Sequence, residues 1–213
     1  MPSLEEMIRA NRRAMKAREV VFRRHGYDSP ASLAFAVGRI LPLPGRVLEI
    51  GTGRGRFLGA LADYVDRLTT LDADAAQQRT ARLHVRRSAG GRPIRFVVGD
   101  AARLPWSAAS FDGVVTMNTF HHLACPLAVL REMMRVLKPG GKLALCDFSP
   151  RGFQIFDRIH RAEGRVHPRL EKGLVEFRRH LREAGWRTSH CKGCNQELLI
   201  AVAPLAAVRR RTA

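Results

Sequence analysis

The sequence predicts an α/β protein: a doubly wound sheet of seven strands that ends in an antiparallel hairpin, with a helical N-terminal cap. Three observations predict this class. Strand and helix patterns alternate from Arg46 onward, a glycine-rich turn follows the first of these strands, and two strand patterns flank a turn near the end of the chain. Strands that alternate with helices form parallel sheets, and right-handed crossovers make such sheets doubly wound.

Length and composition set the bounds of this prediction. A chain of 213 residues with 46% hydrophobic residues can build one well-packed α/β domain, so we expect residues 1–213 to form a single domain. No apolar run approaches the roughly 20 residues of a membrane span. The first residues, Met-Pro-Ser-Leu-Glu-Glu, contain no apolar signal core, and we therefore expect a cytoplasmic protein.

Residues 1–44 are expected to form the cap. Ser3, with a glutamate three places on, has the spacing of a capping box, and apolar residues then follow a helical period over 4–24. Ser29, followed by proline, is typical of an N-cap, and it starts a second helix that stops before Pro42. Because both helices precede the first strand, we expect them to lie over the carboxyl ends of the sheet.

Residues 45–150 carry the regular alternation and are expected to form the core. The strands of this region are predicted at 46–50, 67–71, 94–98, 111–117 and 142–148. Its helices are predicted at 56–64, 75–89 and 126–137. Ligands bind outside the carboxyl ends of the strands in open sheets of this kind.

The C-terminal third departs from the alternation. Residues 151–170 combine a short helical pattern with glycine and proline, and we expect a lid-like insertion that moves. Residues 171–213 are expected to supply a last helix and the hairpin. That helix is predicted from about Leu170 to Ala184, and the hairpin strands are predicted at 186–191 and 197–202.

The glycine-rich turn is the most informative stretch of the chain. It reads Val47-Leu48-Glu49-Ile50-Gly51-Thr52-Gly53-Arg54-Gly55-Arg56-Phe57, a short buried strand that leads through alternate glycines into a helix. Glycine is required where the backbone turns sharply or where a ligand approaches without room for a Cβ. A dinucleotide fingerprint requires G-x-G-x-x-G, and the third glycine of that spacing is absent here.

The turn instead has the pattern E-x-G-x-G-x-G, which resembles motif I of the class I S-adenosylmethionine-dependent methyltransferases. Further matches follow in order: the run Gly99-Asp100-Ala101 continued by Leu104-Pro105-Trp106, then Phe111-Asp112-Gly113-Val114, and Leu137-Lys138-Pro139-Gly140-Gly141. The pattern is most similar to the branch that includes the ubiquinone and menaquinone biosynthesis methyltransferases. The resemblance implies a Rossmann-like sheet, S-adenosylmethionine as cofactor, and a cofactor-binding core at 45–150.

Carried onto this chain, the resemblance implies a set of cofactor-binding residues. They are Glu49, Gly51, Thr52, Gly53, Gly55, Asp72, Ala73, Asp100, Ala101 and Asn118. Asp72 would accept hydrogen bonds from ribose hydroxyls, and Asp100 from the adenine amine. Two alternatives stay open: Asp72 or Asp74 could cap the following helix, and Glu49 could be a capping or core-edge acid.

His121 and His122 are the candidate catalytic residues. They follow Asn118-Thr119-Phe120, so the N-P-P-Y sequence of enzymes that methylate adenine or glutamine amino groups is absent. Either imidazole could act as a general base near neutral pH. The alternative is that the pair braces the loop, because methyl transfer depends mainly on alignment of the reacting atoms.

The net charge of +18 leaves the partner open. Such a charge can indicate a nucleic-acid partner, but the arginines are spread along the chain as a compositional bias would spread them. We therefore expect a small-molecule methyl acceptor. The alternatives are an RNA or protein methyltransferase guided by the basic surface, or a non-catalytic module that only binds the cofactor.

The cysteines are not expected to bind metal or to form a disulfide framework. There are four of them, too few for a disulfide scaffold at this length. His190-Cys191-Lys192-Gly193-Cys194 resembles half of a zinc site, but structural zinc requires four ligands. The prediction is that no metal is bound.

Overall fold

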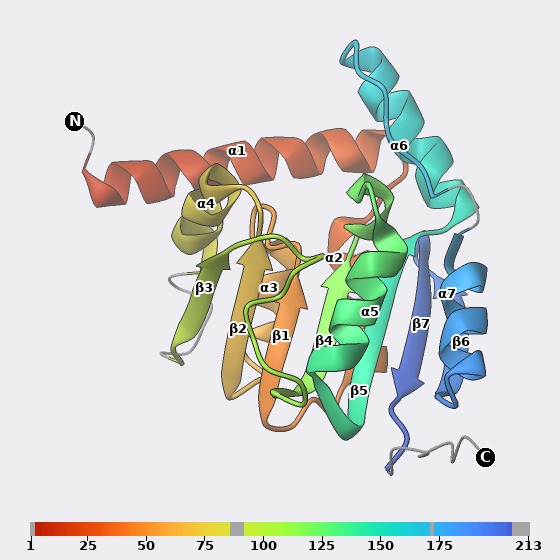
Figure 1. Cartoon of the computed structure of the whole chain (residues 1–213). Helices are drawn as coiled ribbons and strands as arrows, with labels where there is room; N and C mark the ends of the chain where they lie inside the picture. Colours follow the sequence, from red (N-terminus) through yellow and green to blue (C-terminus); the bar gives the residue numbers. More distant parts are fainter. Residues whose placement is uncertain (1–2, 86–91, 171–172, 206–213) are drawn as a thin grey trace, which may run out of the picture.

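A computed structural model describes residues 3–85, 92–170 and 173–205. Its centre is a seven-stranded sheet in the order β3-β2-β1-β4-β5-β7-β6 (Figure 1). The strands are β1 Arg46–Ile50, β2 Arg67–Asp72, β3 Ile94–Val98, β4 Phe111–Met117, β5 Leu137–Phe148, β6 Arg187–Gly193 and β7 Gln196–Val202. β7 pairs antiparallel with both β5 and β6, and the other pairs are parallel. The predicted fold class and terminal hairpin are confirmed.

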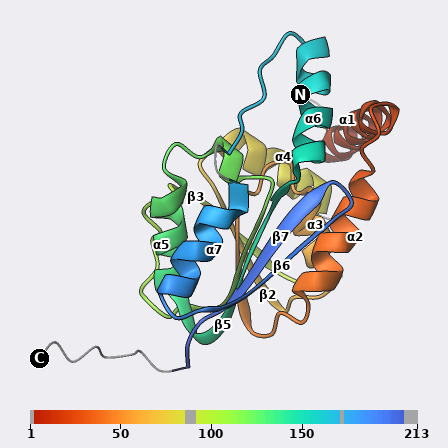
Figure 2. The ribbon, with the colours of Figure 1, turned by 90° about the vertical axis from the view of Figure 1, so that its right-hand side faces the viewer.

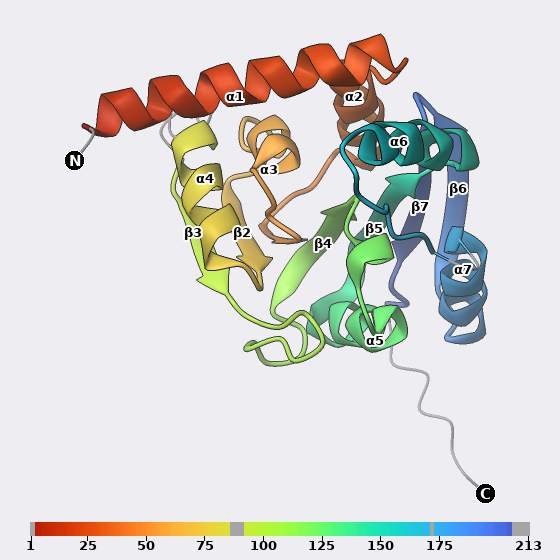
Figure 3. The same ribbon diagram turned by 90° about the horizontal axis from the view of Figure 1, so that it is seen from above.

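Helices cover both faces of the sheet. They are α1 Leu4–Arg24, α2 Ser29–Ile40, α3 Arg56–Leu61, α4 Ala75–Val85, α5 Pro126–Val136, α6 Pro150–Ala162 and α7 Gly173–Glu183, with a 3-10 turn, η1, at Phe120–His122. α2, α3 and α4 lie on one face, and α5 and α7 lie on the other (Figures 2 and 3). A separate buried cluster packs on each face, centred on Leu58 and Leu61 on one side and on Leu130 and Met133 on the other.

The strand order fixes where a ligand can bind. The chain runs from β1 outward to β3, then returns to β4 on the opposite side of β1. The loops after β1 and β4 therefore diverge and leave a crevice at the carboxyl ends of these strands. Val47 to Ile50 pair in register with Gly113 to Thr116, so both strands end at the same level.

Several element boundaries differ from prediction. α3 ends at Leu61, where a helix to residue 64 was predicted, and β5 begins at Leu137. Leu137 pairs with Phe111, and the ladder resumes only at Lys142 opposite Gly113, so the Lys-Pro-Gly-Gly turn is an irregularity inside the strand. α7 begins at Gly173, and residues 171–172 and the predicted end of the α4 helix, 86–89, lie outside the described residues.

The N-cap of the second helix was also assigned to the wrong residue. Asp28 is the N-cap of α2, and its carboxylate accepts a hydrogen bond from the backbone nitrogen of Ala31. Ser29 is the first helical residue, and its buried hydroxyl serves another contact, described below. The capping box of α1 is present as predicted, with Ser3 and Glu6 bonded to one another's backbone.

Of the two helices predicted to lie over the carboxyl ends of the strands, only α1 does so, as does the predicted insertion; α2 instead packs on a face of the sheet through Ala36, Val37 and Ile40. α1 crosses above β3, β2 and β1, while α6 rises beyond the end of β5 (Figures 1 and 3). An aromatic cluster joins them, in which Phe22 and Tyr27 of the cap pack against Phe148, Phe153 and Phe156. Phe148 and Phe156 are stacked with their centroids 4.1 Å apart.

Arg56 fastens the cap to the glycine turn. This arginine is the first residue of α3, and its guanidinium donates to Glu19 at 2.6 Å, to the Ser29 hydroxyl at 3.2 Å and to the Met15 carbonyl at 3.2 Å. The guanidinium also lies over the ring of Phe22, 5.4 Å from the ring centroid. One side chain therefore connects α1, α2 and the start of the helix that follows the glycines.

No helix among the described residues is both long and apolar enough to cross a membrane. The longest is α1, with 21 residues, and it carries charged residues along much of its length.

We expect Arg56→Gln to loosen α1. The change leaves Glu19 in a partly buried position without its cation, which costs about 1–3 kcal/mol in the free energy of unfolding. Amide hydrogen exchange of residues 15–24 should accelerate, while exchange in β1 and β4 should change little. Arg13→Gln, at an exposed position of α1, is the matched control. Equal exchange rates in the two variants would contradict the assigned role of Arg56.

Candidate functional site

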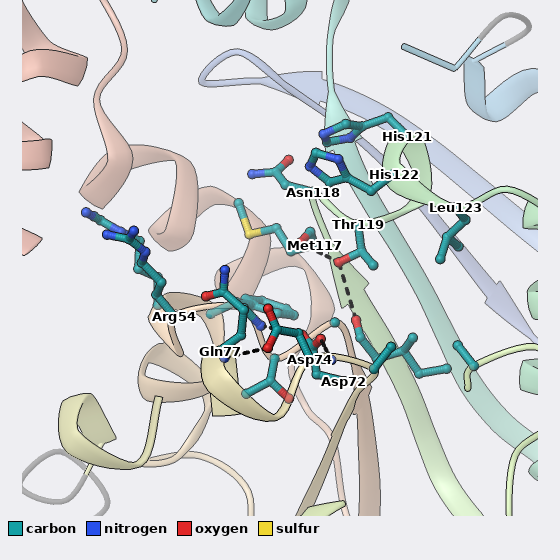
Figure 4. A pocket seen from close by; sticks show the side chains of 18 of the residues that line it. Arg54, Asp72, Asp74, Gln77, Met117, Asn118, Thr119, His121, His122 and Leu123 are labelled. Carbon is teal, nitrogen blue, oxygen red and sulfur yellow. Dashed lines mark hydrogen bonds between the residues drawn. The ribbon is translucent and has the colours of Figure 1, made fainter. Parts of the chain in front are cut away.

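A cavity of about 730 Å³ lies at the crevice between β1 and β4. The glycine turn and the loops after β2 and β3 form one end, and the segment from Met117 to Leu123 with parts of α1 and α6 forms the other. Figure 4 shows Asp72 and Asp74 on one side of this cavity and the rings of His121 and His122 on the other. The cavity therefore has two chemically different ends.

The glycine turn has a backbone that only glycine adopts readily. Gly51, Gly53 and Gly55 have φ angles of 85°, 49° and 81°. A Cβ on Gly51 would lie 2.1 Å from the Thr119 hydroxyl, and one on Gly55 would lie 3.0 Å from Ala81. A Cβ on Gly53 would meet nothing within 4 Å, so this glycine leaves open space at the cavity wall.

The Asp72 carboxylate holds this turn in place. Its two oxygens accept from the backbone nitrogens of Gly53 at 2.8 Å and Asp74 at 2.9 Å. Asp74 accepts from the nitrogens of Ala76 and Gln77 and so caps α4. The alternative in which Asp74 is the helix cap is confirmed, and Asp72 remains at the cavity wall.

Glu49 lies beneath the turn and not on the cavity wall. It is fully buried, and its carboxylate accepts from the Thr70 hydroxyl at 2.5 Å. The Thr70 oxygen lies 2.6 Å from that of Thr52, which in turn lies 3.4 Å from the Gln78 amide nitrogen. Burial raises the pKa of Glu49 to about 8, against the opposing hydrogen bond from Thr70. This hydrogen-bonded chain links Glu49 to the turn through Thr52.

The third strand delivers the predicted adenine motif to the same end. Gly99, Asp100 and Ala101 line the cavity. One oxygen of Asp100 accepts from the backbone nitrogen of Ala102 at 2.8 Å. The nitrogen of Gly99 donates to the Asp72 carbonyl at 3.0 Å, which joins the loops after β2 and β3.

Asn118 marks the change from strand to loop after β4. It has a left-handed φ of 53°, and its backbone nitrogen donates to the Cys146 carbonyl at 2.9 Å. Its side-chain oxygen is buried at the cavity wall without a hydrogen-bond partner among the described residues. A buried acceptor of this kind costs free energy unless a ligand or water donates to it.

His121 is fixed by Asp147, the last acid of β5. Its Nδ1 lies 2.6 Å from Asp147 Oδ1, and its backbone nitrogen donates to Oδ2 at 3.2 Å. Asp147 is buried and also accepts from the nitrogen of Phe148 at 2.8 Å. Because an ionised carboxylate only accepts, Nδ1 carries the proton and the Nε2 lone pair stays free. Nε2 of His121 is buried without a partner.

Other imidazoles crowd the same end of the cavity. The rings of His122 and His167 lie 4.1 Å and 4.9 Å from that of His121, and His160 lies 4.6 Å from His167, centroid to centroid. Desolvation lowers the pKa of His122 to about 4 and that of His167 to about 3, and the neighbouring His121 acts in the same direction on both. The rings of His122 and His167 are therefore neutral near pH 7.

Aromatic carbon completes this end of the cavity. Phe22, Tyr27, Phe148 and Phe156 lie on its wall, as do His160 and His167. Burial raises the pKa of Tyr27 to about 12, so its hydroxyl stays protonated. Phe153 contacts Phe148 behind this wall and lines a neighbouring cavity.

The structure brings most of the predicted site residues to one cavity. Those on its wall are Gly51, Thr52, Gly53, Asp72, Ala73, Asp100, Ala101, Asn118, His121 and His122. Glu49 and Gly55 lie outside the wall and support it from below. Asp147, His160 and His167 also belong to this site and were not among the predicted residues. An acid at the end of a buried strand was the available signal for Asp147, as it was for Glu49.

Cys191 and Cys194 lie apart from this cavity on the terminal hairpin. Cys191 pairs in register with Leu198, and Cys194 is exposed in the turn with a φ of 50°. His190 is bonded through Nε2 to Glu197 at 2.7 Å. Among the described residues, the hydrogen-bond partner of His190 is therefore an acid of the neighbouring strand.

Comparison with known proteins identifies a family. The family model described as "Methyltransferase domain" matches residues 48–145. The chain is 35% identical over 136 residues to a demethylmenaquinone methyltransferase of Deinococcus radiodurans, which covers 64% of this chain and 56% of the relative. It is 32% identical over 194 residues to the 27-O-demethylrifamycin SV methyltransferase of Amycolatopsis mediterranei, with 81% and 69% covered. Several other curated relatives are matched over 42% to 54% of their length.

Solved structures share the fold. A crystal structure from Methanococcus maripaludis, described as a putative S-adenosyl-L-methionine-dependent methyltransferase, aligns with a TM-score of 0.68 at 18% identity. The alignment covers 94% of this chain and 95% of that one.

We expect the stability of the protein to fall as pH rises through the range in which Glu49 keeps its proton. The unfolded carboxyl ionises from about pH 4.5, and the folded one only near pH 8, so the unfolded state binds fewer protons in between. At about 1.4 kcal/mol per pKa unit, up to roughly 4 kcal/mol is lost across this window.

Chemical denaturation at pH 5 and pH 8 measures this effect. Glu49→Gln lacks the titrating proton and should not lose this stability. Its free energy of unfolding, relative to that of the parent, should therefore be higher at pH 8 than at pH 5. Asp112→Asn is the control. Burial raises the pKa of Asp112, but the hydrogen bonds from Lys138 and Arg46 outweigh it and lower the pKa, so this carboxylate is ionised at both pH values. Its difference from the parent should be equal at both pH values. A Glu49 variant that behaves like this control would contradict the raised pKa.

Proposed function

Since this chain belongs to the class I S-adenosylmethionine-dependent methyltransferase family, we propose that it transfers a methyl group from S-adenosylmethionine to a hydroxyl of a small acceptor. The observation that carries the proposal is the single cavity with two ends. One end has the glycine turn and two carboxylates, and the other has aromatic carbon and an imidazole fixed by Asp147.

The turn end fits the cofactor in charge and shape. Space remains where Gly53 lacks a Cβ, and Asn118 presents an unpartnered acceptor that an ammonium group could satisfy. Asp72 and Asp100 each present carboxylate oxygen at the wall, suited to ribose hydroxyls and the adenine amine. When bound, S-adenosylmethionine supplies an electrophilic methyl group on a sulfonium. Glu49, through Thr70 and Thr52, would keep the turn in the conformation that receives it.

The imidazole end fits an acceptor that must lose a proton. His121 Nε2 has a free lone pair, and Nδ1–H is held by a buried carboxylate that also stabilises the imidazolium formed on protonation. A hydroxyl placed against Nε2 would give up its proton as the oxygen attacks the methyl carbon. The aromatic wall excludes water and holds the acceptor in line, which contributes more than the base itself.

A small acceptor agrees with the size of this end and with the relatives. The names of those relatives specify a demethylmenaquinone and a hydroxyl of demethylrifamycin as the molecules methylated. A wall built of Phe22, Tyr27, Phe148 and Phe156 would suit the apolar surface or the ring of such an acceptor. The basic surface then needs no macromolecular partner to account for it.

We further propose four functional parts within one domain. Residues 1–44 cap the site, residues 45–150 bind the cofactor, residues 151–170 cover the acceptor, and residues 171–213 close the sheet with a helix and a hairpin. The aromatic contacts between the cap and α6 support a cover that opens and closes as a unit. The contacts of Arg56 with α1 would couple that movement to the cofactor turn.

We expect Asp72→Ala to weaken the binding of both S-adenosylmethionine and S-adenosylhomocysteine. The loss of charge-assisted bonds, together with the loosened turn, corresponds to about 1–3 kcal/mol or roughly 5- to 150-fold in Kd. Titration calorimetry measures it. Asp66→Ala, at an exposed acid at the other end of β2, should leave the affinity unchanged. Absence of binding to the folded parent protein would refute the proposed cofactor.

Methyl transfer should depend on both His121 and Asp147. Release of S-adenosylhomocysteine would be followed with a panel of hydroquinones, naphthols and aliphatic alcohols. With any acceptor that reacts, His121→Asn should reduce kcat about 10²- to 10⁴-fold, and Asp147→Asn should also reduce it, while the affinity for S-adenosylhomocysteine is retained. An unchanged kcat in His121→Asn would contradict the role of the base, and turnover of amines but not hydroxyls would contradict the oxygen acceptor.

A further inference from the structure

His121, His122 and His167 together form a group of potential metal ligands. One ring nitrogen from each lies within 4.8 Å of the other two. His121 and His122 belong to η1 after β4, and His167 comes from the segment between α6 and α7. These elements meet only above the carboxyl ends of β4 and β5, at the acceptor end of the cavity.

Two of these histidines have a buried nitrogen without a partner. Nε2 of His121 and Nδ1 of His167 make no hydrogen bond among the described residues, and their side chains are 1% and 2% exposed. An oxygen of Asp157 lies 3.9 Å from Nδ1 of His167, which is too far for a hydrogen bond. Buried polar atoms are rarely left unsatisfied in native structures, so both nitrogens are available to a ligand.

His121 also has the supporting contact that metal-binding histidines have. A ligating imidazole almost always donates its second N–H to a carboxylate or a carbonyl, which fixes the ring and raises its basicity. Asp147 fills this position at 2.6 Å from Nδ1, and it is held in turn by two backbone nitrogens. The ring of His121 therefore points Nε2 in a defined direction.

We propose that His121, His122 and His167 bind a divalent transition-metal ion, Zn²⁺ in the first instance, at the acceptor end of the cavity. Three imidazoles with an open fourth position form a zinc site of the kind found in enzymes, with Zn–N distances of about 2.0–2.1 Å. The rings would move closer together on binding. Mg²⁺ and Ca²⁺ prefer oxygen ligands and would bind poorly here.

Metal binding would regulate the proposed reaction. This step rests on the proposed function, because it uses His121 Nε2 as the proton acceptor. A lone pair that is coordinated to a metal cannot accept a proton, so the two uses of Nε2 exclude one another. The zinc-loaded protein should therefore be slow in methyl transfer, and a chelator should restore the rate.

Metal binding is tested directly, without acceptor or cofactor. Protein free of any affinity tag is stripped with a chelator, then titrated with Zn²⁺ by calorimetry and with Co²⁺ by visible absorption. We expect one ion per chain and the intense absorption of four-coordinate Co²⁺, with no uptake of Mg²⁺. His122→Ala and His167→Ala should each weaken the affinity at least about tenfold, and Asp147→Asn about 10- to 100-fold.

Control variants decide between this site and others. His180→Ala, which removes a histidine of α7 outside the group, should bind the ion like the parent. Binding of S-adenosylhomocysteine in the presence of chelator shows that each variant is folded. If the ion is lost on changing Cys191 and Cys194 to serine but not on changing His167, the metal binds the hairpin and the proposal is overturned.

The remaining outcomes are also decisive. Absence of stoichiometric Zn²⁺ and Co²⁺ binding to protein that still binds S-adenosylhomocysteine overturns the metal site and leaves the proposed function intact. Metal binding to protein that does not bind S-adenosylhomocysteine overturns the proposed function and leaves the metal site intact. Faster methyl transfer with Zn²⁺ than with chelator would overturn the exclusion between ligand and base.

Discussion

Buried and partly buried acids at the carboxyl ends of the strands must find hydrogen-bond donors, and the site is organised around this requirement. Glu49 on β1 binds Thr70, Asp72 at the end of β2 binds the nitrogen of Gly53, and Asp147 on β5 binds His121. A buried polar group without a partner is costly. Asp72 and Asp147 therefore fix the loops that supply their donors, and Glu49, which burial keeps protonated, is bonded to Thr70 of the neighbouring strand. The sheet order brings these loops together around one cavity.

The cap depends on that same framework. Arg56 follows the glycine turn directly, and its guanidinium is the point at which α1 and α2 are attached to it. The far end of α1 packs its aromatic residues on α6 through Phe22 and Phe156. A change in the conformation of the glycine turn would therefore be transmitted to α1 and α6 by two kinds of contact. One is the polar contact of Arg56 with Glu19, and the other is the packing of Arg56 on the ring of Phe22.

The acceptor end combines apolar packing with an unusual density of imidazoles. Desolvation keeps His122 and His167 neutral, with their pKa values lowered to about 4 and 3. Neutral rings add no charge that would repel a sulfonium nearby, and they keep their lone pairs. The arrangement that gives His121 a free Nε2 for the proposed proton transfer would also give the proposed metal ion a ligand, and a single lone pair can serve only one of these at a time.

The sequence by itself determined the fold class, the order in which the motifs follow the strands along the chain, and the cofactor end of the site. These depend on local signals: hydrophobic period, glycines at 51, 53 and 55, and an acid at the end of a strand. The tertiary structure decided the rest. Asp147 and His167 reach His121 from 26 and 46 positions away along the chain, because the loops after β4 and β5 meet above adjacent strands. No spacing pattern encodes such a meeting, since it depends on sheet order and on how α6 packs against the cap.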